Sequence, residues 1–142
     1  MAPHHAVLRS LSDDGGARLP IWFRIDRSRQ LLLARAEGSL SRREFEDSLQ
    51  EAVAHPDFSP GFRQLCDFRE LHEFGGGYDE YHEVIENGRK FSDRLQGGRV
   101  ALVAERDSVF GMLRMYQAIA QELPLEISVF RDMEEAERWL EL

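Results

Sequence analysis

Residues 100–104 read Val-Ala-Leu-Val-Ala, a run that is apolar at every position. A strand with no polar face is typical of a sheet that is covered on both sides, as in α/β folds. Gly97 and Gly98 precede the run, and a helical stripe of apolar residues follows it and ends at Pro124. The members of this stripe are Val109, Met112, Leu113, Tyr116, Ile119, Ala120 and Leu123. A buried strand next to an amphipathic helix predicts a parallel sheet.

The alternation of strands and helices extends toward the N-terminus. Apolar and polar residues alternate in Ile21–Ile25, which predicts a strand, and residues 31–36 predict a second strand. The connection between them is short, so the two form an antiparallel hairpin, because parallel neighbours need a long crossover. Ser41 and Glu44 then match a capping box at the start of a helix, which Pro56 ends.

The rest of the chain continues the same pattern. Residues 62–68 predict a central strand, residues 78–95 a helix, residues 127–129 a last strand and residues 133–140 a last helix. The predicted order is β-β-α-β-α-β-α-β-α. We therefore expect an α/β fold with a mostly parallel five-stranded sheet, an N-terminal antiparallel hairpin and four helices.

Length and composition fit a single cytoplasmic domain. A chain of 142 residues can bury one core, and we expect it at residues 19–142 behind a flexible leader at residues 1–18. The formal charge of −8 disfavours nucleic acid and anionic membranes as partners. Cys66 is the only cysteine, so no intramolecular disulfide forms, in keeping with a reducing cytosol. No secretory signal and no membrane-length apolar run are found.

Six short segments follow one another along the chain: 34–38 (ARAEG), 55–58 (HPDF), 61–62 (GF), 65–70 (LCDFRE), 110–116 (FGMLRMY) and 129–132 (VFRD). In this order they resemble the STAS-like superfamily, which includes anti-sigma-factor antagonists and is structurally akin to CRAL-TRIO lipid-binding domains. The chain looks most like small bacterial STAS-like proteins of unassigned function. The resemblance runs from about Ile21 to Leu140 and implies the fold.

The sequence departs from regulated antagonists at one motif. These proteins carry an Asp-Ser-Ser/Thr-Gly-like phosphoacceptor turn after the central strand. Asp67 stands in the place of the motif's aspartate, but Phe68, Arg69 and Glu70 follow it and offer no hydroxyl group. The resemblance therefore does not carry over the phosphorylation switch.

No residue pattern indicates a catalytic, cofactor or metal site. Asp67, Glu70 and Glu73 supply oxygen donors past the expected strand end, but without the spacing of a Ca²⁺ loop. We expect these carboxylates to pair with Arg63 or Arg69. Other candidates have simpler explanations. His72 and His82 are expected to be exposed, Gly75-Gly76-Gly77 to form a mobile loop, and Cys66 to be an inert core thiol.

The candidate interaction residues are Trp22, Asp67, Arg69, Phe110 and Met115. Trp22 lies on the strand face opposite Ile21 and Phe23, and Phe110 and Met115 flank the main stripe of their helix. Helical and strand periodicity cannot separate extra core packing from an apolar patch for a partner.

These observations lead us to expect a non-catalytic, STAS-like interaction or regulatory module rather than an enzyme. Its partner would be another protein or a second copy of the chain. The alternative is a carrier of a small hydrophobic ligand or lipid in the CRAL-TRIO manner, which needs a cavity beneath the helices at residues 78–95 and 108–123.

Overall fold

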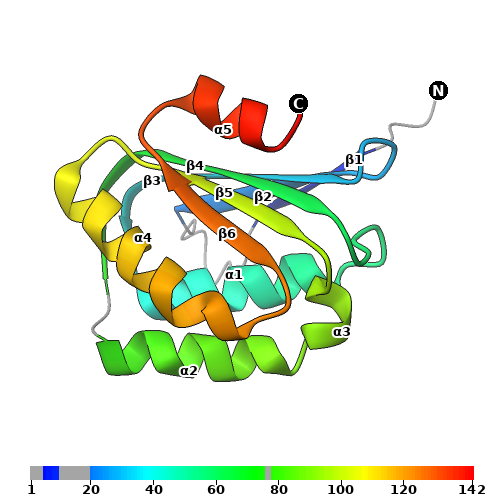
Figure 1. Cartoon of the computed structure of the whole chain (residues 1–142), viewed down its shortest axis with the longest axis horizontal. Coiled ribbons are helices and arrows are strands. Elements are labelled where there is room, and N and C mark those ends of the chain that lie inside the picture. Colours follow the sequence, from blue (N-terminus) through cyan, green and yellow to red (C-terminus); the bar gives the residue numbers. More distant parts are fainter. Residues whose placement is uncertain (1–4, 10–19, 76–77) are drawn as a thin grey trace.

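The computed structural model describes residues 5–9, 20–75 and 78–142. The structure contains one six-stranded sheet, and its strands follow one another across the sheet in chain order (Figure 1). The two pairings at the N-terminal end are antiparallel and the other three are parallel. The strands are β1 (His5–Arg9), β2 (Ile21–Asp26), β3 (Leu31–Leu40), β4 (Arg63–Phe74), β5 (Arg99–Val103) and β6 (Glu126–Phe130).

Most of the helices cover one face of this sheet. Each parallel strand adds on the same side of the preceding one, so right-handed crossovers place all the connecting helices on one face. These helices are α1 (Arg42–Ala54), α2 (Tyr78–Arg89), α3 (Ser92–Leu95) and α4 (Asp107–Ile119), with a 3₁₀ turn, η1 (Ala120–Glu122), after α4. The last helix, α5 (Met133–Trp139), lies alone on the opposite face (Figure 1).

Two cores follow from this arrangement. The larger core lies between the sheet and the helices α1–α4, where Phe45 packs edge to face against Phe68, Phe74 and Tyr116. The smaller one lies beneath α5, where Ala136 and the following Leu140 pack against β4 and β5 and are fully buried. The sheet is therefore buried on both faces only where α5 covers it.

Local signals explain where the elements begin. The Ser41 hydroxyl accepts a hydrogen bond from the Glu44 amide at 3.1 Å, and the Glu44 carboxylate accepts one from the Ser41 amide at 2.8 Å. This is the predicted capping box at the start of α1. Gly98 enters β5 where a β-carbon would lie 3.0 Å from the Phe62 carbonyl oxygen, so a larger residue does not fit there.

The predicted fold class and element order are confirmed, with four differences in detail. Within the expected leader, residues 5–9 pair with β2 as the edge strand β1, whereas residues 1–4 and 10–18 lie outside the described residues. The sheet therefore has six strands rather than five. The helix expected at 78–95 is divided into α2 and α3. The central strand, expected to end at residue 68, continues to Phe74.

None of the helices in the described part of the chain has the length and apolar character to cross a membrane.

Candidate functional site

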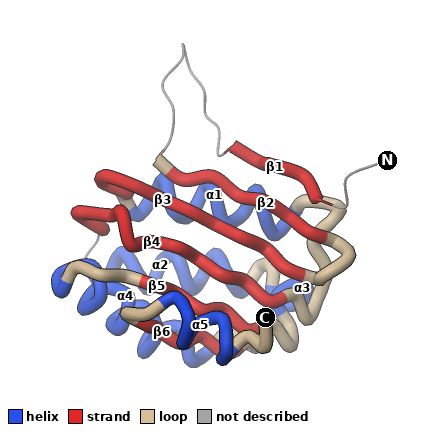
Figure 2. Tube along the Cα trace, turned by 90° about the horizontal axis from the view of Figure 1, so that it is seen from above, coloured by secondary structure: helices blue, strands red, loops and turns tan. Residues whose placement is uncertain are grey.

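The sheet face that α5 leaves uncovered is the most distinctive surface of the molecule. Seen from the α5 side, β5 and β6 lie behind α5, whereas β1, β2 and β3 have no helix in front of them (Figure 2). This arrangement follows from the sequential strand order, which puts α1, α2 and α4 on the far face. We call the uncovered part of β2, β3 and β4 the open face.

Strand register arranges the open face in two rows. Trp22 on β2 lies opposite Arg35 on β3, and Arg35 is paired in turn with Asp67 on β4. Residues paired across neighbouring strands point to the same side of the sheet. The same rule gives a second row, which consists of Arg24, Leu33 and Leu65. The first row therefore carries an aromatic ring, a guanidinium and a carboxylate. The second row carries a guanidinium and two leucine side chains.

A shallow hollow lies over these rows, next to α5. Its volume is about 330 Å³, and Met133 of α5 lines one side of it. The sheet residues that line the hollow are Trp22, Arg24, Leu33, Ala34, Arg35, Leu65 and Asp67. The volume is at the lower end of the range for small-molecule sites, and the surface around it is large enough for a segment of protein.

The charged groups of the hollow differ in how they are held. The Arg35 guanidinium lies 5.6 Å from the centroid of the Trp22 ring, a cation–π contact. Arg69 holds the Asp67 carboxylate with two side-chain hydrogen bonds of 2.8 and 2.9 Å. These bonds lower the pKa of Asp67, with Arg35 as a further positive neighbour, although partial burial opposes the shift. Arg24 and Arg35 make no ion pair with another described residue.

The structure unites three of the five predicted interaction residues. Trp22 from β2 meets Asp67 and Arg69 from β4 at the open face. Phe110 and Met115 lie on α4, half-buried against the larger core. Phe110 is further covered by the Arg131 guanidinium, 4.2 Å from its ring centroid. The apolar surface that these two side chains offer a partner is therefore smaller than the sequence suggested.

The carboxylates that were expected past a strand end lie within a strand. β4 continues beyond Asp67 through Glu70 and Glu73, with irregular register against β3. Asp67 pairs with Arg69, one of the two arginines expected for it, whereas Arg63 binds backbone carbonyls of Leu140 and Arg29 at 2.9 and 2.8 Å. In the described ranges, no three His, Cys, Asp or Glu side chains are close enough to hold a metal ion.

The predictions for the cysteine, the two histidines and the glycine loop have different outcomes. Cys66 is buried, as expected, and its burial next to Asp67 raises the pKa of the thiol to about 12. His72 is exposed, as expected, but His82 is half-buried. In the glycine loop, Gly76 and Gly77 lie outside the described residues.

A cavity also lies beneath the helices, where the carrier hypothesis requires one. Its volume is about 40 Å³, and it is lined almost entirely by apolar side chains of the larger core, with Gln64 as the polar exception. Pockets that bind small molecules usually measure about 300–1,000 Å³. The cavity is thus far smaller than a lipid chain requires.

Sequence reasoning missed three residues of the open face: Arg24, Leu33 and Arg35. A signal was present, because Arg24 alternates with the buried Phe23 and Ile25, as Trp22 does. The signal in β3 was weaker, since Leu33 resembles its buried neighbours Leu31 and Leu32 in the sequence.

Comparison with known proteins supports the fold. No family model matches the chain, and no curated protein sequence matches it. Among solved structures, it is similar to an uncharacterized protein of the DUF3478 family with a SpoIIAA-like fold from Shewanella loihica PV-4. The two are 19% identical, with a TM-score of 0.50, over 99% of this chain and 98% of that one. The chain thus has the SpoIIAA-like, or STAS-like, fold that the sequence resemblance implied.

Proposed function

We propose that this protein is a non-catalytic interaction module of the cytoplasm, and that it binds a protein partner through the open face. The observation that carries this proposal is the row formed by Trp22, Arg35 and Asp67 on a sheet face without a covering helix. Tryptophan and arginine are the residues that most often contribute strongly to binding at protein interfaces.

The energetics of the open face fit this role. Trp22 and Leu33 are half-buried, so part of their apolar surface is still in contact with water. Covering apolar surface yields about 25 cal/mol per Å². Arg24 and Arg35 border this apolar centre with positive charge on one side, as part of the polar rim of an interface does.

The regulatory part of the proposal differs from that of classical antagonists. Phe68 and Glu70 have no hydroxyl group, and the Asp67 carboxylate is bound by Arg69. We therefore propose that binding at the open face does not depend on phosphorylation of this turn. The carrier alternative is less favoured, because a lipid would require the helices to move apart around a cavity of about 40 Å³.

Site-specific photo-cross-linking in the native cell tests the proposal. A photoreactive amino acid replaces Arg24 on the open face or, as a control, Arg43, which is exposed on α1 on the other side of the sheet. We expect position 24 to give discrete cross-links to a protein and position 43 to give none. Equal labelling from the two positions, or no protein cross-link from position 24, would contradict the proposal.

A further inference from the structure

The surface around the hollow carries both signs of charge, in two separate strips. Arg24 and Arg35 form the positive strip on β2 and β3. The negative strip belongs to α5, where Glu137 follows Met133 by one helical turn and Glu134 precedes Glu137 by three residues. Residues at these spacings lie on one flank of a helix. Since Met133 lines the hollow, this is the flank of α5 that borders it.

The two strips form no salt bridge within the described part of the chain, although Arg35 contacts the Trp22 ring. Neither the two arginines nor the two glutamates form an ion pair with another described residue. Arg24, Arg35 and Glu134 are exposed, and Glu137 is half-buried. A partner can therefore approach both strips at the same time.

The arrangement of the strips is self-complementary. The positive strip lies on one side of the hollow and the negative strip on the other. A two-fold axis through the hollow places the positive strip of one copy against the negative strip of the other. The symmetry then makes the same contact a second time, with the two copies exchanged. In such an interface, residue i contacts residue j, and j contacts i.

We propose that the occupant of the open face is a second copy of this chain. In this dimer, α5 of each copy lies over β2 and β3 of the other, and so completes the helical layer that each copy lacks. Glu134 and Glu137 meet Arg24 and Arg35 of the second copy, and the Trp22 ring is covered. The inference rests on the proposed function, because it identifies the partner of the same surface.

Two other occupants fit the surface less well. An acidic segment of another protein would be attracted by Arg24 and Arg35 but repelled by Glu134 and Glu137 on the flank of α5. A dimer through α4 would use Phe110 and Met115, but the Arg131 guanidinium already covers the Phe110 ring, 4.2 Å from its centroid. The net charge of −8 also opposes self-association, so a dimer needs local charge complementarity of the kind that the open face provides.

Sedimentation of charge-reversed variants tests the inference. The first variant is Arg24→Glu with Arg35→Glu, and the second is Glu134→Arg with Glu137→Arg. We expect the wild type to form a dimer in a concentration series up to about 1 mM, and each variant alone to dissociate at least about tenfold more readily. An equimolar mixture of the two variants should recover a heterodimer, because each supplies the charges that the other has lost.

A matched control separates local pairing from net charge. The variant Arg29→Glu with Arg43→Glu changes the net charge as the first variant does, at two exposed positions away from the open face. It should dimerise within about threefold of the wild type, a difference small beside the tenfold steps of affinity. If a reversal unfolds the chain, Arg35→Gln and Glu137→Gln provide milder changes, and each should still weaken the dimer.

The outcomes distinguish the inference from the proposed function. A wild type that stays monomeric up to about 1 mM, a mixture that fails to recover the heterodimer, or a control that dissociates like the first variant overturns the second-copy inference. A dimer that only Phe110→Asp and Met115→Asp disrupt also overturns it and places the contact on α4. If position 24 then still cross-links to a different protein, the proposed function stands without the dimer.

Discussion

Arg69 binds both oxygens of the Asp67 carboxylate: Nε donates to Oδ1 at 2.8 Å, and Nη2 donates to Oδ2 at 2.9 Å. The Arg69 backbone amide adds a third hydrogen bond to Oδ1, at 3.2 Å. The register shift in β4 makes this contact possible, since it leaves Phe68 and Arg69 together opposite Ala36. The Asp67 carboxylate is therefore held by an arginine two residues further along the same strand.

The pair predicts a pH effect. Because Arg69 lowers the pKa of Asp67 below its unfolded value, the pair stabilises the fold at neutral pH, and this stabilisation is lost as the pH falls through the folded pKa. The Arg69 side chain is 40% exposed, so the loss should be about 1 kcal/mol or less. In Arg69→Ala, the Asp67 pKa should rise toward its ordinary value, as followed by NMR titration of the carboxyl carbon. An unchanged pKa in this variant would show that Arg69 is not the cause, and Arg29→Ala is the control.

Arg94 is predicted to stabilise the end of α1. Its side chain donates to the Val53 carbonyl at 2.6 Å, to the His55 carbonyl at 2.9 Å and to the Phe58 carbonyl. Arg94→Ala should lower the free energy of unfolding by about 2–4 kcal/mol, because three carbonyls lose a donor and each hydrogen bond contributes about 0.5–1.5 kcal/mol net. Arg94→Lys should fall between the alanine variant and the wild type, since one ammonium cannot replace the guanidinium fork.

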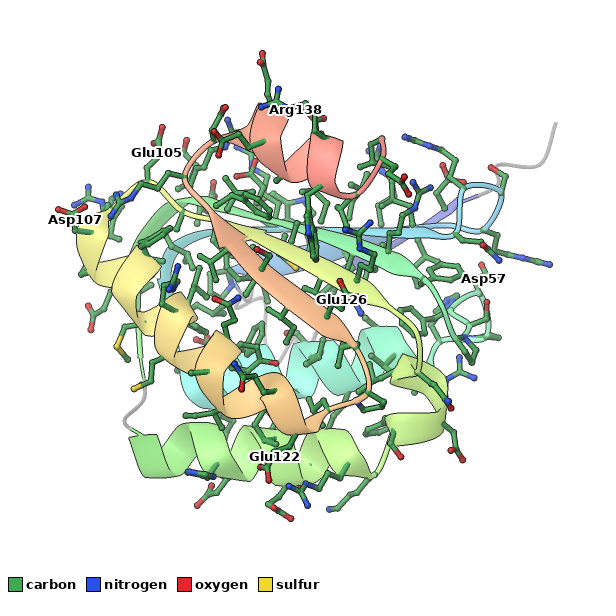
Figure 3. The ribbon with its side chains drawn as sticks, viewed as in Figure 1. Asp57, Glu105, Asp107, Glu122, Glu126 and Arg138 are labelled. Atoms are coloured by element: carbon green, nitrogen blue, oxygen red, sulfur yellow. The ribbon has the colours of Figure 1, made fainter. Side chains whose placement is uncertain are left out.

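Chemical denaturation measures the stability of the Arg94 variants, with Arg138→Ala as the control variant. Arg138 is exposed on α5 and points away from the sheet (Figure 3), so its removal should cost less than about 0.5 kcal/mol. Equal losses in the two alanine variants would mean that the carbonyl contacts of Arg94 contribute nothing to stability.

Substitution by alanine should have opposite effects on stability at two glycines, Gly98 and Gly111. At Gly98, a new β-carbon would lie 3.0 Å from the Phe62 carbonyl oxygen and 3.2 Å from that of Leu95. Both are backbone atoms, so Gly98→Ala should destabilise the protein by about 1–3 kcal/mol. At Gly111 in α4 nothing lies within 4 Å, so Gly111→Ala should stabilise it by roughly 0.5–1 kcal/mol. Thermal unfolding of both variants checks this pair, and a shift of the same sign in both would be inconsistent with the packing described.

Cys66 should react only when the protein unfolds. Burial, with a smaller contribution from the Asp67 charge, raises the pKa of its thiol to about 12, so the thiolate is nearly absent at neutral pH. Labelling with a thiol reagent should follow the unfolding transition, with one thiol modified per chain in denaturant. Fast labelling of the native protein would show that the thiol is accessible.

The raised pKa of the Cys66 thiol also predicts that the stability of the fold decreases at alkaline pH. In the unfolded chain the Cys66 thiol loses its proton near its ordinary pKa of 9.0, whereas in the folded protein it keeps the proton up to about 12. The folded state therefore binds more protons in this interval, and stability should fall as the pH rises through it. Cys66→Ala should reduce this loss, as measured by denaturation at a series of alkaline pH values.

Helices and inner strands could be predicted because their signals are local. The stripe from Val109 to Leu123 and the capping box at Ser41 each specify an element without reference to the rest of the chain. The second half of β4 could not be predicted in this way. Its register is irregular after Asp67, so the strict alternation of apolar and polar residues that marks a strand is lost.

The open face was predicted only in part, because it depends on what the helices leave uncovered. Strand periodicity placed Trp22 on the other face of its strand from Ile21 and Phe23. It cannot show that α5 does not extend over β2 and β3. The sequential strand order decides this point. Phe110 and Met115 lie on a helix flank that packs against the sheet, where a side chain can be half-buried without any partner, so their role in a contact stays a prediction.

The two tryptophans provide the most direct test of the open face as a binding surface. Trp22 lies in it, whereas Trp139 lies on α5, in contact with Phe130 and Arg99. Labelling with fluorotryptophan gives one ¹⁹F resonance for each ring, and Trp139→Phe assigns them. The spectrum is recorded for dilute protein, for concentrated protein and for dilute protein in a lysate of its native cells. We predict that the Trp22 resonance shifts in at least one of the last two samples, and that it shifts by more than the resonance of Trp139, whose ring packs against Phe130 and Arg99. A Trp22 resonance that is unchanged in all three samples would contradict binding at the open face.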